Sequence, residues 1–264
     1  ADQYGGGDSE RYLGRVLGER RDQVVITTKF GGTPPPGVAG GDPAYVRRAC
    51  EASLRRLGTS YIDLYLLHVP DTVTPIAETL QALDDLVAAG KVREIGCSHF
   101  SAEQLADAAA AAREHGLRRF VCVQNEYNLL EREAEQAVLA AAAALDVAFV
   151  PFFPLAMGLL GGRYRDASPA PPGTRLIASG DPEDEAFVRD RLAVVERLAA
   201  FAERRGHTVL ELALSWLADR PQVAAVIPGA MSPEQVAANV AAAGAWRLTA
   251  DEQDELARVT TTGS

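Results

Sequence analysis

The sequence predicts an α/β fold in which a parallel β-sheet is covered by α-helices, and two observations support this prediction. Short runs of almost continuous apolar residues alternate along the chain with amphipathic helical patterns, which is typical of strands that helices bury on both faces. The interval between neighbouring runs is long enough for a helix, as a parallel connection requires. Because no linker separates two regions of different composition, we predict one domain over residues 1–264.

Each predicted element has local signals of its own. Apolar, β-favouring runs predict six strands, at residues 24–30, 62–68, 92–98, 119–124, 147–152 and 223–228. Amphipathic patterns predict helices at residues 9–20, 42–58, 76–90, 101–116, 131–145, 184–205, 209–219, 232–243 and 249–259. Asp42 with Pro43 marks the start of the second helix and Gly58 its end. Residues 156–183 are rich in Gly, Pro and Asp, which predicts a long functional loop.

The composition argues against several classes of protein. The net charge of −10 argues against general binding to nucleic acids or anionic membranes, and no apolar run reaches the roughly 20 residues of a membrane helix. Cys50, Cys97 and Cys122 have no CxxC spacing, which indicates reduced, buried thiols and a cytoplasmic location. His68 with Asp71 lacks a second histidine at metal-binding spacing. We therefore expect no bound metal and neither a nucleic-acid nor a membrane partner.

The residues that end the predicted strands distinguish two α/β architectures. The strands end at Lys29, His68, Ser98, Gln124, Phe152 and Pro228. A (β/α)8 barrel of the TIM-barrel type places its chemistry at the C-terminal ends of many different strands. A doubly wound sheet instead gathers its ligand groups at one switch point. The sequence therefore favours the barrel.

Lys29 is unusual because the chain uses arginine at almost every other basic position. Only two of the 26 basic residues are lysines, and an ammonium group can be tuned chemically where a guanidinium cannot. A phenol is a weak proton donor that a neighbouring cation strengthens. We therefore expect Tyr4 to protonate a carbonyl oxygen, with Lys29 supplying the charge and His68 orienting that oxygen.

These residues also fit simpler roles when each is taken singly. Lys29 fits a solvated charge at the rim of a sheet, and His68 fits a hydrogen-bonded histidine of the core. A Schiff base formed by Lys29, as in a barrel aldolase, is a chemical alternative that the residues leave open.

Seven motifs, taken in order, resemble the aldo-keto reductase family over essentially the whole chain. They are "YGGGDSERYLG", "VVITTKFG", "SLRRLGTSYIDLYLLHVPD", "VREIGCSHF", "VQNEYNLLERE", "FFPLAMGLLGGRY" and "VIPGAMSPEQVAAN". The resemblance implies a (β/α)8 barrel without a Rossmann domain. It further implies that the protein binds NADPH in an extended form, with NADH left open, and reduces a small-molecule aldehyde or ketone.

The resemblance also implies a role for each matching residue. Tyr4 resembles the family's proton donor, Lys29 the lysine that tunes it, and His68 the histidine that orients the substrate. The implied cofactor contacts are Ser98, His99 and Gln124 at the nicotinamide carboxamide, Phe152 stacked on the nicotinamide, and Leu155, Gly158, Leu160, Gly229, Met231, Gln235 and Asn239 elsewhere along the cofactor. A helix that begins after Gly229 also suits a phosphate on physical grounds.

The chain departs from the family pattern at three places. His99 stands where an asparagine usually follows the serine, and Met231 stands where related sequences often carry an arginine for the 2′-phosphate. The family's catalytic aspartate lies five residues before the tyrosine, and that position precedes Ala1.

The last departure implies an N-terminally truncated barrel, with six parallel strands present and the first two strands and first helix missing. We therefore expect weak or no activity from residues 1–264 alone. A non-catalytic nicotinamide-binding or regulatory barrel stays open as an alternative function.

Overall fold

The computed structural model describes residues 1–163 and 182–260, with the side chains of 182–187 excepted. The chain divides into two compact units. Unit 1 comprises Ala1–Asn125 and Ala137–Phe149, and unit 2 comprises Glu126–Gln136 and Val150–Ser264. The expectation of a single domain over residues 1–264 stays a prediction.

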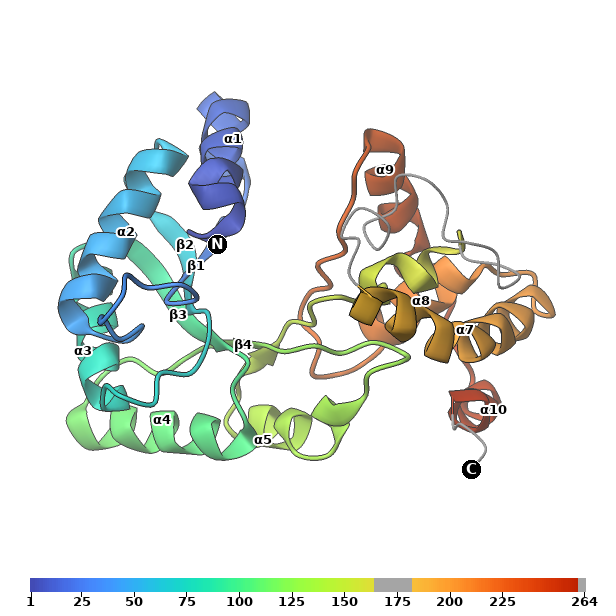
Figure 1. Cartoon of the computed structure of the whole chain (residues 1–264). Helices are drawn as coiled ribbons and strands as arrows, with labels where there is room; N and C mark the ends of the chain where they lie inside the picture. Colours follow the sequence, from blue (N-terminus) through green and yellow to red (C-terminus); the bar gives the residue numbers. More distant parts are fainter. Residues whose placement is uncertain (164–181, 261–264) are drawn as a thin grey trace. The chain divides into compact units, whose positions relative to one another are not determined.

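Unit 1 is built on a parallel sheet whose strands follow one another in chain order (Figure 1). The strands are β1 (Thr27–Phe30), β2 (Ile62–Leu67), β3 (Val92–Ser98), β4 (Cys122–Gln124) and β5 (Ala148–Phe149). Each strand pairs with the next in parallel. A doubly wound sheet reverses its strand order at a switch point, and this sheet has no reversal. The strands therefore wind in one direction, as in a barrel.

Helices of unit 1 form a layer along one side of the sheet, and all but the first of them connect its strands (Figure 1). They are α1 (Asp8–Leu17), α2 (Pro43–Leu57), α3 (Ile76–Ala88), α4 (Ala102–His115) and α5 (Val138–Ala144). Two short 3-10 helices flank α1: η1 (Tyr4–Gly7) precedes it and η2 (Gly18–Gln23) follows it. The predicted caps of α2 are confirmed. The side chain of Asp42 accepts a 2.8 Å hydrogen bond from the amide of Tyr45, and Gly58 ends the helix at a φ of 64°.

The core of unit 1 lies between the sheet and this helical layer. Phe30 and Tyr65 stack with ring centroids 4.6 Å apart, and the apolar strand residues around them are fully buried, including Ile62, Leu66 and Leu67. β2 is buried along nearly its whole length, which is why its sequence is apolar without alternation. The near-continuous apolar run at 62–68 therefore forms a buried, interior strand of the sheet.

The parallel register brings the ends of the strands to one edge of the sheet. Lys29 pairs with Leu66, and Ser98 pairs with Gln124. The ladder continues one residue beyond β2, where the amide of His68 donates to the carbonyl of Phe30 at 2.8 Å. The polar residues that end successive strands therefore share this edge, as predicted.

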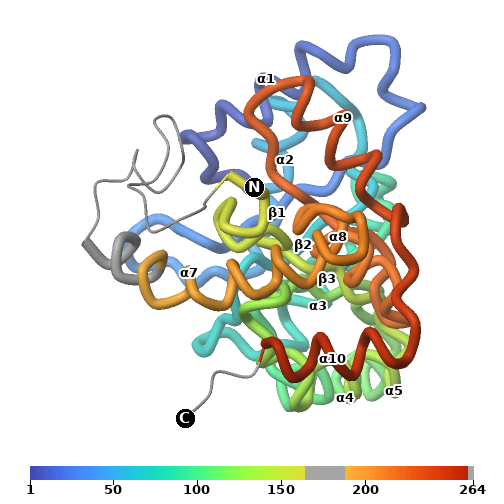
Figure 2. The backbone as a smooth tube through the Cα atoms, turned by 90° about the vertical axis from the view of Figure 1, so that its right-hand side faces the viewer, coloured from blue at the N-terminus to red at the C-terminus, as the bar shows by residue number. Residues whose placement is uncertain are grey.

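Unit 2 is helical in the residues that the structure describes. It contains η3 (Glu133–Glu135), η4 (Ala156–Gly161), α7 (Pro182–Glu203), α8 (Val209–Ala218), α9 (Pro233–Ala242) and α10 (Ala250–Thr260), whose path Figure 2 follows. α8 is its most buried helix, and Trp216 on α8 packs against Tyr127 with ring centroids 5.0 Å apart. Phe201 stacks on Trp246 at 5.7 Å.

Several predicted elements differ from the observed ones. The predicted helix 131–145 is interrupted and forms η3 and α5, and the predicted strands at 119–124 and 147–152 are shorter as β4 and β5.

The predicted strand at 223–228, and with it the count of six parallel strands, is wrong for the described residues, because 224–228 have no regular structure. Residues 223–228 are half-exposed or exposed. A strand needs ladder hydrogen bonds to a neighbour, and an apolar pattern alone does not supply that neighbour. Part of the predicted loop 156–183 forms η4, and its residues 164–181 lie outside the described residues.

Candidate active site

Tyr4 lies at the start of η1, directly before three glycines. Gly5–Gly7 have φ values of 59°, 62° and 93°, and glycine adopts this left-handed region at little cost. The glycines let the backbone turn from Tyr4 into α1. The amide of Asp2 donates to the carbonyl of Lys29 at 2.9 Å, so the segment that holds Tyr4 is attached to β1.

Lys29 and Tyr4 meet at this edge of the sheet. Lys29 Nζ lies 3.3 Å from the Tyr4 hydroxyl and 5.3 Å from the centre of its ring. Lys29 belongs to β1 and precedes the fully buried Phe30. An ammonium group held this close can stabilise negative charge that develops on the phenol oxygen during a reaction. The arrangement therefore suits a phenol that gives up a proton.

His68 is the third member of the group. Its ring is 7 % exposed and stands nearly perpendicular to the ring of Tyr4, with centroids 5.7 Å apart. Burial is the largest cause that lowers the pKa of His68, and together with the nearby positive charges of Lys29 and His99 it brings this pKa to about 4. The imidazole is therefore neutral near pH 7, and a neutral imidazole donates one hydrogen bond and accepts another.

Gly32 leaves the space that the His68 ring occupies. A Cβ at Gly32 would lie 2.2 Å from Gln3 Oε1 and 2.9 Å from His68 Nδ1. The side chain of Gln3 is held there because Thr33 Oγ1 donates to its Oε1 at 3.0 Å. Our sequence analysis missed Gln3, Gly32 and Thr33. The available signal was the second of two consecutive glycines directly after a strand end.

Ser98, His99 and Gln124 form a polar cluster at the ends of β3 and β4. Ser98 Oγ donates to the backbone carbonyl of Gln124 at 2.9 Å. The side-chain oxygen of Gln124 is buried and has no hydrogen-bond partner among the described residues, and the same holds for His68 Nδ1. Buried polar atoms of this kind cost free energy unless a ligand or water pairs with them. The cluster therefore fits a ligand that carries amide donors.

His99 occupies a position with a special backbone conformation. Its φ is 61°, in the left-handed region where Asn, Asp and His are enriched among non-glycine residues. His99 Nδ1 lies 3.0 Å from the carbonyl oxygen of His68 and 3.0 Å from Ser98 Oγ. A carbonyl only accepts hydrogen bonds, so Nδ1 is the nitrogen that carries the proton. A histidine therefore adopts this backbone conformation with less strain than most other non-glycine residues would.

The other candidate residues lie in unit 2, in two segments. In the first, the amides of Gly158 and Leu160 both donate to the carbonyl of Leu155, at 2.8 and 3.2 Å. The Leu160 side chain is fully buried, so only its backbone is available to a ligand. The Phe152 ring lies 5.2 Å from that of Phe153, edge to face.

The second segment, Gly229–Asn239, is organised around the start of α9. Ser232 caps the helix, with its Oγ accepting from the amide of Gln235 at 3.3 Å. Gln235 Oε1 accepts in turn from the amide of Met231 at 2.7 Å, and Asn239 Nδ2 donates to the carbonyl of Gly229 at 3.3 Å. The Met231 side chain is 88 % exposed. Gln235 and Asn239 thus shape this loop as well as being candidate ligand contacts.

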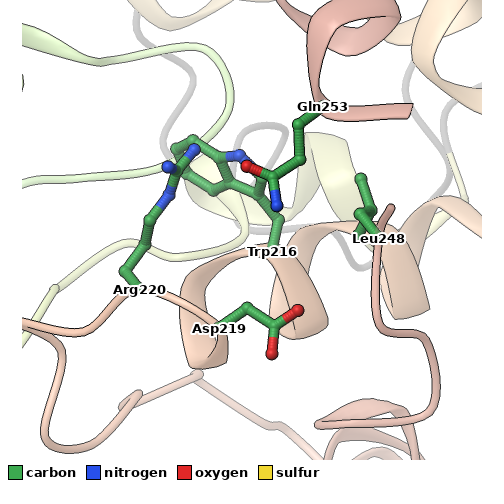
Figure 3. Close-up of a pocket in the computed structure, with 5 residues that line it drawn as sticks. All are labelled: Trp216, Asp219, Arg220, Leu248 and Gln253. Carbon is green, nitrogen blue, oxygen red and sulfur yellow. The ribbon is translucent and has the colours of Figure 1, made fainter. Parts of the chain in front are cut away.

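A separate crevice lies in unit 2, and none of the candidate residues lines it. Trp216, Asp219, Arg220, Leu248 and Gln253 line it (Figure 3), and its cavity volume is about 20 Å³. The guanidinium of Arg220 stands over the Trp216 ring at 4.4 Å.

Among the residues that the structure describes, no helix is both long and apolar enough to cross a bilayer. In the same residues, no cluster of three or more His, Cys, Asp or Glu side chains has the arrangement of a metal site.

Comparison with known proteins places the chain among reductases. The model of the Aldo/keto reductase family matches residues 1–260. The chain is 34 % identical to "Aldo-keto reductase YhdN" of Bacillus subtilis (strain 168), over 97 % of this chain and 76 % of that protein. It is 32 % identical to "Probable aldo-keto reductase 1" of Glycine max, over 96 % of this chain and 71 % of that protein.

These matches confirm the resemblance and the fold class that the sequence predicted. The family folds as a (β/α)8 barrel, and the unreversed parallel sheet of unit 1 agrees with it. The truncation and the low activity of residues 1–264 stay predictions, as do the individual roles of the candidate residues.

Proposed function

Because the chain belongs to the aldo/keto reductase family, whose members are NAD(P)H-dependent oxidoreductases of carbonyl compounds, we propose that it reduces an aldehyde or ketone with NADPH. One observation supports the proposal most strongly. Lys29 Nζ lies 3.3 Å from the Tyr4 hydroxyl, and the neutral ring of His68 stands beside that phenol. A proton donor, a cation and a hydrogen-bonding ring thus share one edge of the sheet.

The chemistry of these three side chains matches what reduction of C=O requires. Reduction adds a hydride to the carbonyl carbon and a proton to its oxygen. NADPH, when bound, would supply this hydride. The O–H bond of Tyr4 breaks as its proton moves to the carbonyl oxygen, and the Lys29 ammonium stabilises the phenolate left behind. The phenolate then regains a proton from solvent. His68, being neutral, donates a hydrogen bond that orients the carbonyl oxygen.

The polar cluster of unit 1 suits the carboxamide of the cofactor. The proton of Ser98 Oγ is already donated to Gln124, so Ser98 offers lone pairs to a ligand. Gln124 Oε1 is a second buried acceptor without a partner among the described residues. A carboxamide NH2 group would satisfy both acceptors. We assign Ser98, His99 and Gln124 to this group on that basis.

In unit 2 we assign Phe152 to the nicotinamide and the segment Gly229–Asn239 to the adenosine phosphate. The dipole at the start of α9 favours a phosphate there. We assign Leu155, Gly158 and Leu160 to other parts of the cofactor. Met231 offers no charge to a 2′-phosphate, so we propose only a modest preference for NADPH over NADH.

We also propose that the protein works in the reducing cytoplasm. Cys50, Cys97 and Cys122 are free and buried, and burial raises the pKa values of Cys50 and Cys122 to about 12. Thiols of this kind are unreactive. This pattern is typical of proteins that need no disulfides.

The test is NADPH oxidation with propanal, benzaldehyde and cyclohexanone, followed by absorbance. Tyr4→Phe removes only the hydroxyl and is expected to lower turnover about 100-fold or more, with NADPH binding retained. Wild-type turnover by this variant would reject Tyr4 as the proton donor. Trapping of a substrate adduct on Lys29 by borohydride would favour the Schiff-base alternative.

A further inference from the structure

Helix α1, which follows Tyr4 and η1 along the chain, packs against the rest of unit 1 in an unusual way. Surface helices normally bury an apolar stripe. In α1 the apolar residues Tyr12, Leu13 and Val16 are 59 %, 44 % and 65 % exposed, whereas the acidic Glu10 is 1 % exposed and is the one buried residue of the helix. A charged contact, and not an apolar one, therefore orients α1 in unit 1.

Both carboxylate oxygens of Glu10 are engaged by groups from other elements. Thr28 Oγ1, in β1, donates to Oε1 at 2.5 Å, and Arg56 Nε, in α2, donates to Oε2 at 2.6 Å. Arg56 also donates to Ser53 Oγ at 3.2 Å. Charge-assisted hydrogen bonds are shorter and stronger than neutral ones, and a buried carboxylate needs such partners.

Two glycines bring the backbone of this region close to α2. A Cβ at Gly7 would lie 2.7 Å from Arg56 Cδ, and a Cβ at Gly14 would lie 2.5 Å from the carbonyl oxygen of Leu57. The positions of Gly7 and Gly14 thus admit no larger residue without a shift. Glu10 lies between them in the sequence, so its ion pair and the two close approaches act on the same short stretch of chain.

This stretch adjoins Tyr4 along the chain, and one of its contacts, Thr28, is the residue next to Lys29. Thr28 precedes Lys29 in β1, and η1 joins Tyr4 to α1. The Tyr4 side chain itself is 45 % exposed, so it is not held by packing. Glu10 is also coupled to the Tyr4 segment electrostatically, because burial raises the pKa of Asp2 and the charge of Glu10 raises it further.

We propose that Glu10, Thr28 and Arg56 form a positioning network that sets where the Tyr4 hydroxyl lies relative to Lys29. Thr28 connects the network to the strand of Lys29, and Glu10 connects it to the helix that follows Tyr4. The inference rests on the proposed function, in which Tyr4 donates the proton. None of the three residues touches the reacting atoms, and a displacement of about 1 Å in a reacting group costs about 100-fold in rate.

The experiment compares Thr28→Val with Thr28→Ser in the full chain. Valine keeps the shape of threonine and removes the hydroxyl that donates to Glu10, whereas serine keeps the hydroxyl. Asp85→Asn, which breaks an exposed ion pair with Arg47 between α3 and α2, is the control for lost surface charge. The measurements are single-turnover reduction of benzaldehyde by NADPH over a range of pH, NADPH binding by fluorescence quenching, and thermal unfolding.

Thr28→Val is expected to reduce the rate of the chemical step about 10- to 100-fold, with NADPH affinity within about twofold of wild type. The upper pH limit of the rate is expected to move to higher pH, because an ammonium farther from the phenol stabilises the phenolate less. Thr28→Ser is expected to restore both the rate and the pH limit. Asp85→Asn is expected to match wild type throughout.

A wild-type rate and pH limit in Thr28→Val would overturn the inference. A lower rate that accompanies a lower unfolding temperature, with the pH limit unmoved, would also overturn it, since a structural role alone explains that result. Should Thr28→Val not fold, Arg56→Lys takes its place under the same criteria, because lysine keeps the charge and loses the Nε contact. Full activity in Tyr4→Phe would instead reject the proposed function, independently of the network.

Discussion

In unit 1 the sheet holds Lys29, His68, Ser98 and Gln124. The candidate residues of unit 2 are held by local contacts within loops and at a helix start. Lys29 and Ser98 lie in paired strands, and His68 extends the ladder through its amide. In Gly229–Asn239 the contacts are a cap at Ser232 and short-range amide hydrogen bonds. A ladder residue cannot move unless its neighbours move, and a loop residue can.

This difference predicts different consequences of substitution in the two units. A change in unit 1 alters the geometry between reacting groups, which affects the rate of the chemical step. A change in the exposed loop of unit 2 alters a contact to the cofactor, which affects its affinity and selectivity. Four substitutions or conditions test this division, and we take them in order of decreasing expected effect.

Lys29→Arg is expected to lower the rate of carbonyl reduction about 100-fold or more. The charge is conserved, but a planar guanidinium cannot replace a compact ammonium 3.3 Å from the Tyr4 hydroxyl. The measurement is single-turnover NADPH oxidation with benzaldehyde. The matched control is Lys91→Arg, at the only other lysine, which forms an ion pair with Glu51 on the surface of unit 1. Equal rates in the two variants would show that the position of Lys29 confers no special role.

Gly32→Ala is expected to lower the same rate about 10- to 100-fold. The added methyl group would meet Gln3 Oε1 and His68 Nδ1, so one of these side chains must shift. The control is Gly161→Ala in unit 2, where a Cβ would meet no atom within 4 Å. Loss of activity in both variants, with unfolding temperatures lowered alike, would contradict a specific effect on His68.

Met231→Arg is expected to strengthen NADPH binding about 10-fold and to leave NADH binding unchanged. An added charge-assisted hydrogen bond contributes about 1.5–3 kcal/mol, and about 1.4 kcal/mol corresponds to a factor of ten. Isothermal titration with each cofactor measures the change. Val240→Arg, which adds the same charge at an exposed position of α9, controls for general attraction. A similar gain for NADH would place the 2′-phosphate elsewhere.

The smallest expected effect is a loss of stability in acid that originates at His68. Its pKa is about 4 in the folded protein, against an ordinary value of 6.5. Between these values the unfolded chain binds more protons, so the free energy of unfolding falls as the pH drops from 6.5 towards 4. In His68→Gln the unfolding temperature is expected to fall less over this interval, each 1 kcal/mol being worth about 2–4 °C. His115→Gln, at the end of α4, serves as the control, and parallel curves for all three proteins would contradict the assignment.

Much of unit 1 could be predicted from the sequence because its signals are local. The strand ends at Lys29 and His68 follow from apolar runs that stop at a polar residue, and the cap at Asp42 follows from side-chain chemistry. The same reasoning was wrong at 223–228. That run has the composition of a strand, but a strand also needs a partner, and partners are not encoded in the run itself.

Glu10 and Gly32 show what local signals leave undetermined. Glu10 lies in a helical segment where an acidic residue ordinarily faces solvent, and its burial depends on Thr28 and Arg56, which come from two other elements. Gly32 has no positive φ, so the chain conformation does not require it. It is required by the side chains of Gln3 and His68, which fold next to it from distant parts of unit 1.

The sequence by itself therefore determined the type and order of most elements of unit 1, the strand ends and the residue types available for chemistry, because these depend on periodicity and on neighbours along the chain. Only the tertiary structure decided that Lys29 Nζ lies 3.3 Å from the Tyr4 hydroxyl, that Glu10 is buried, and that 224–228 form no strand. The physical reason is that hydrogen bonds and ion pairs between distant segments depend on register and packing. Those quantities are set by many residues acting together, and no single motif contains them.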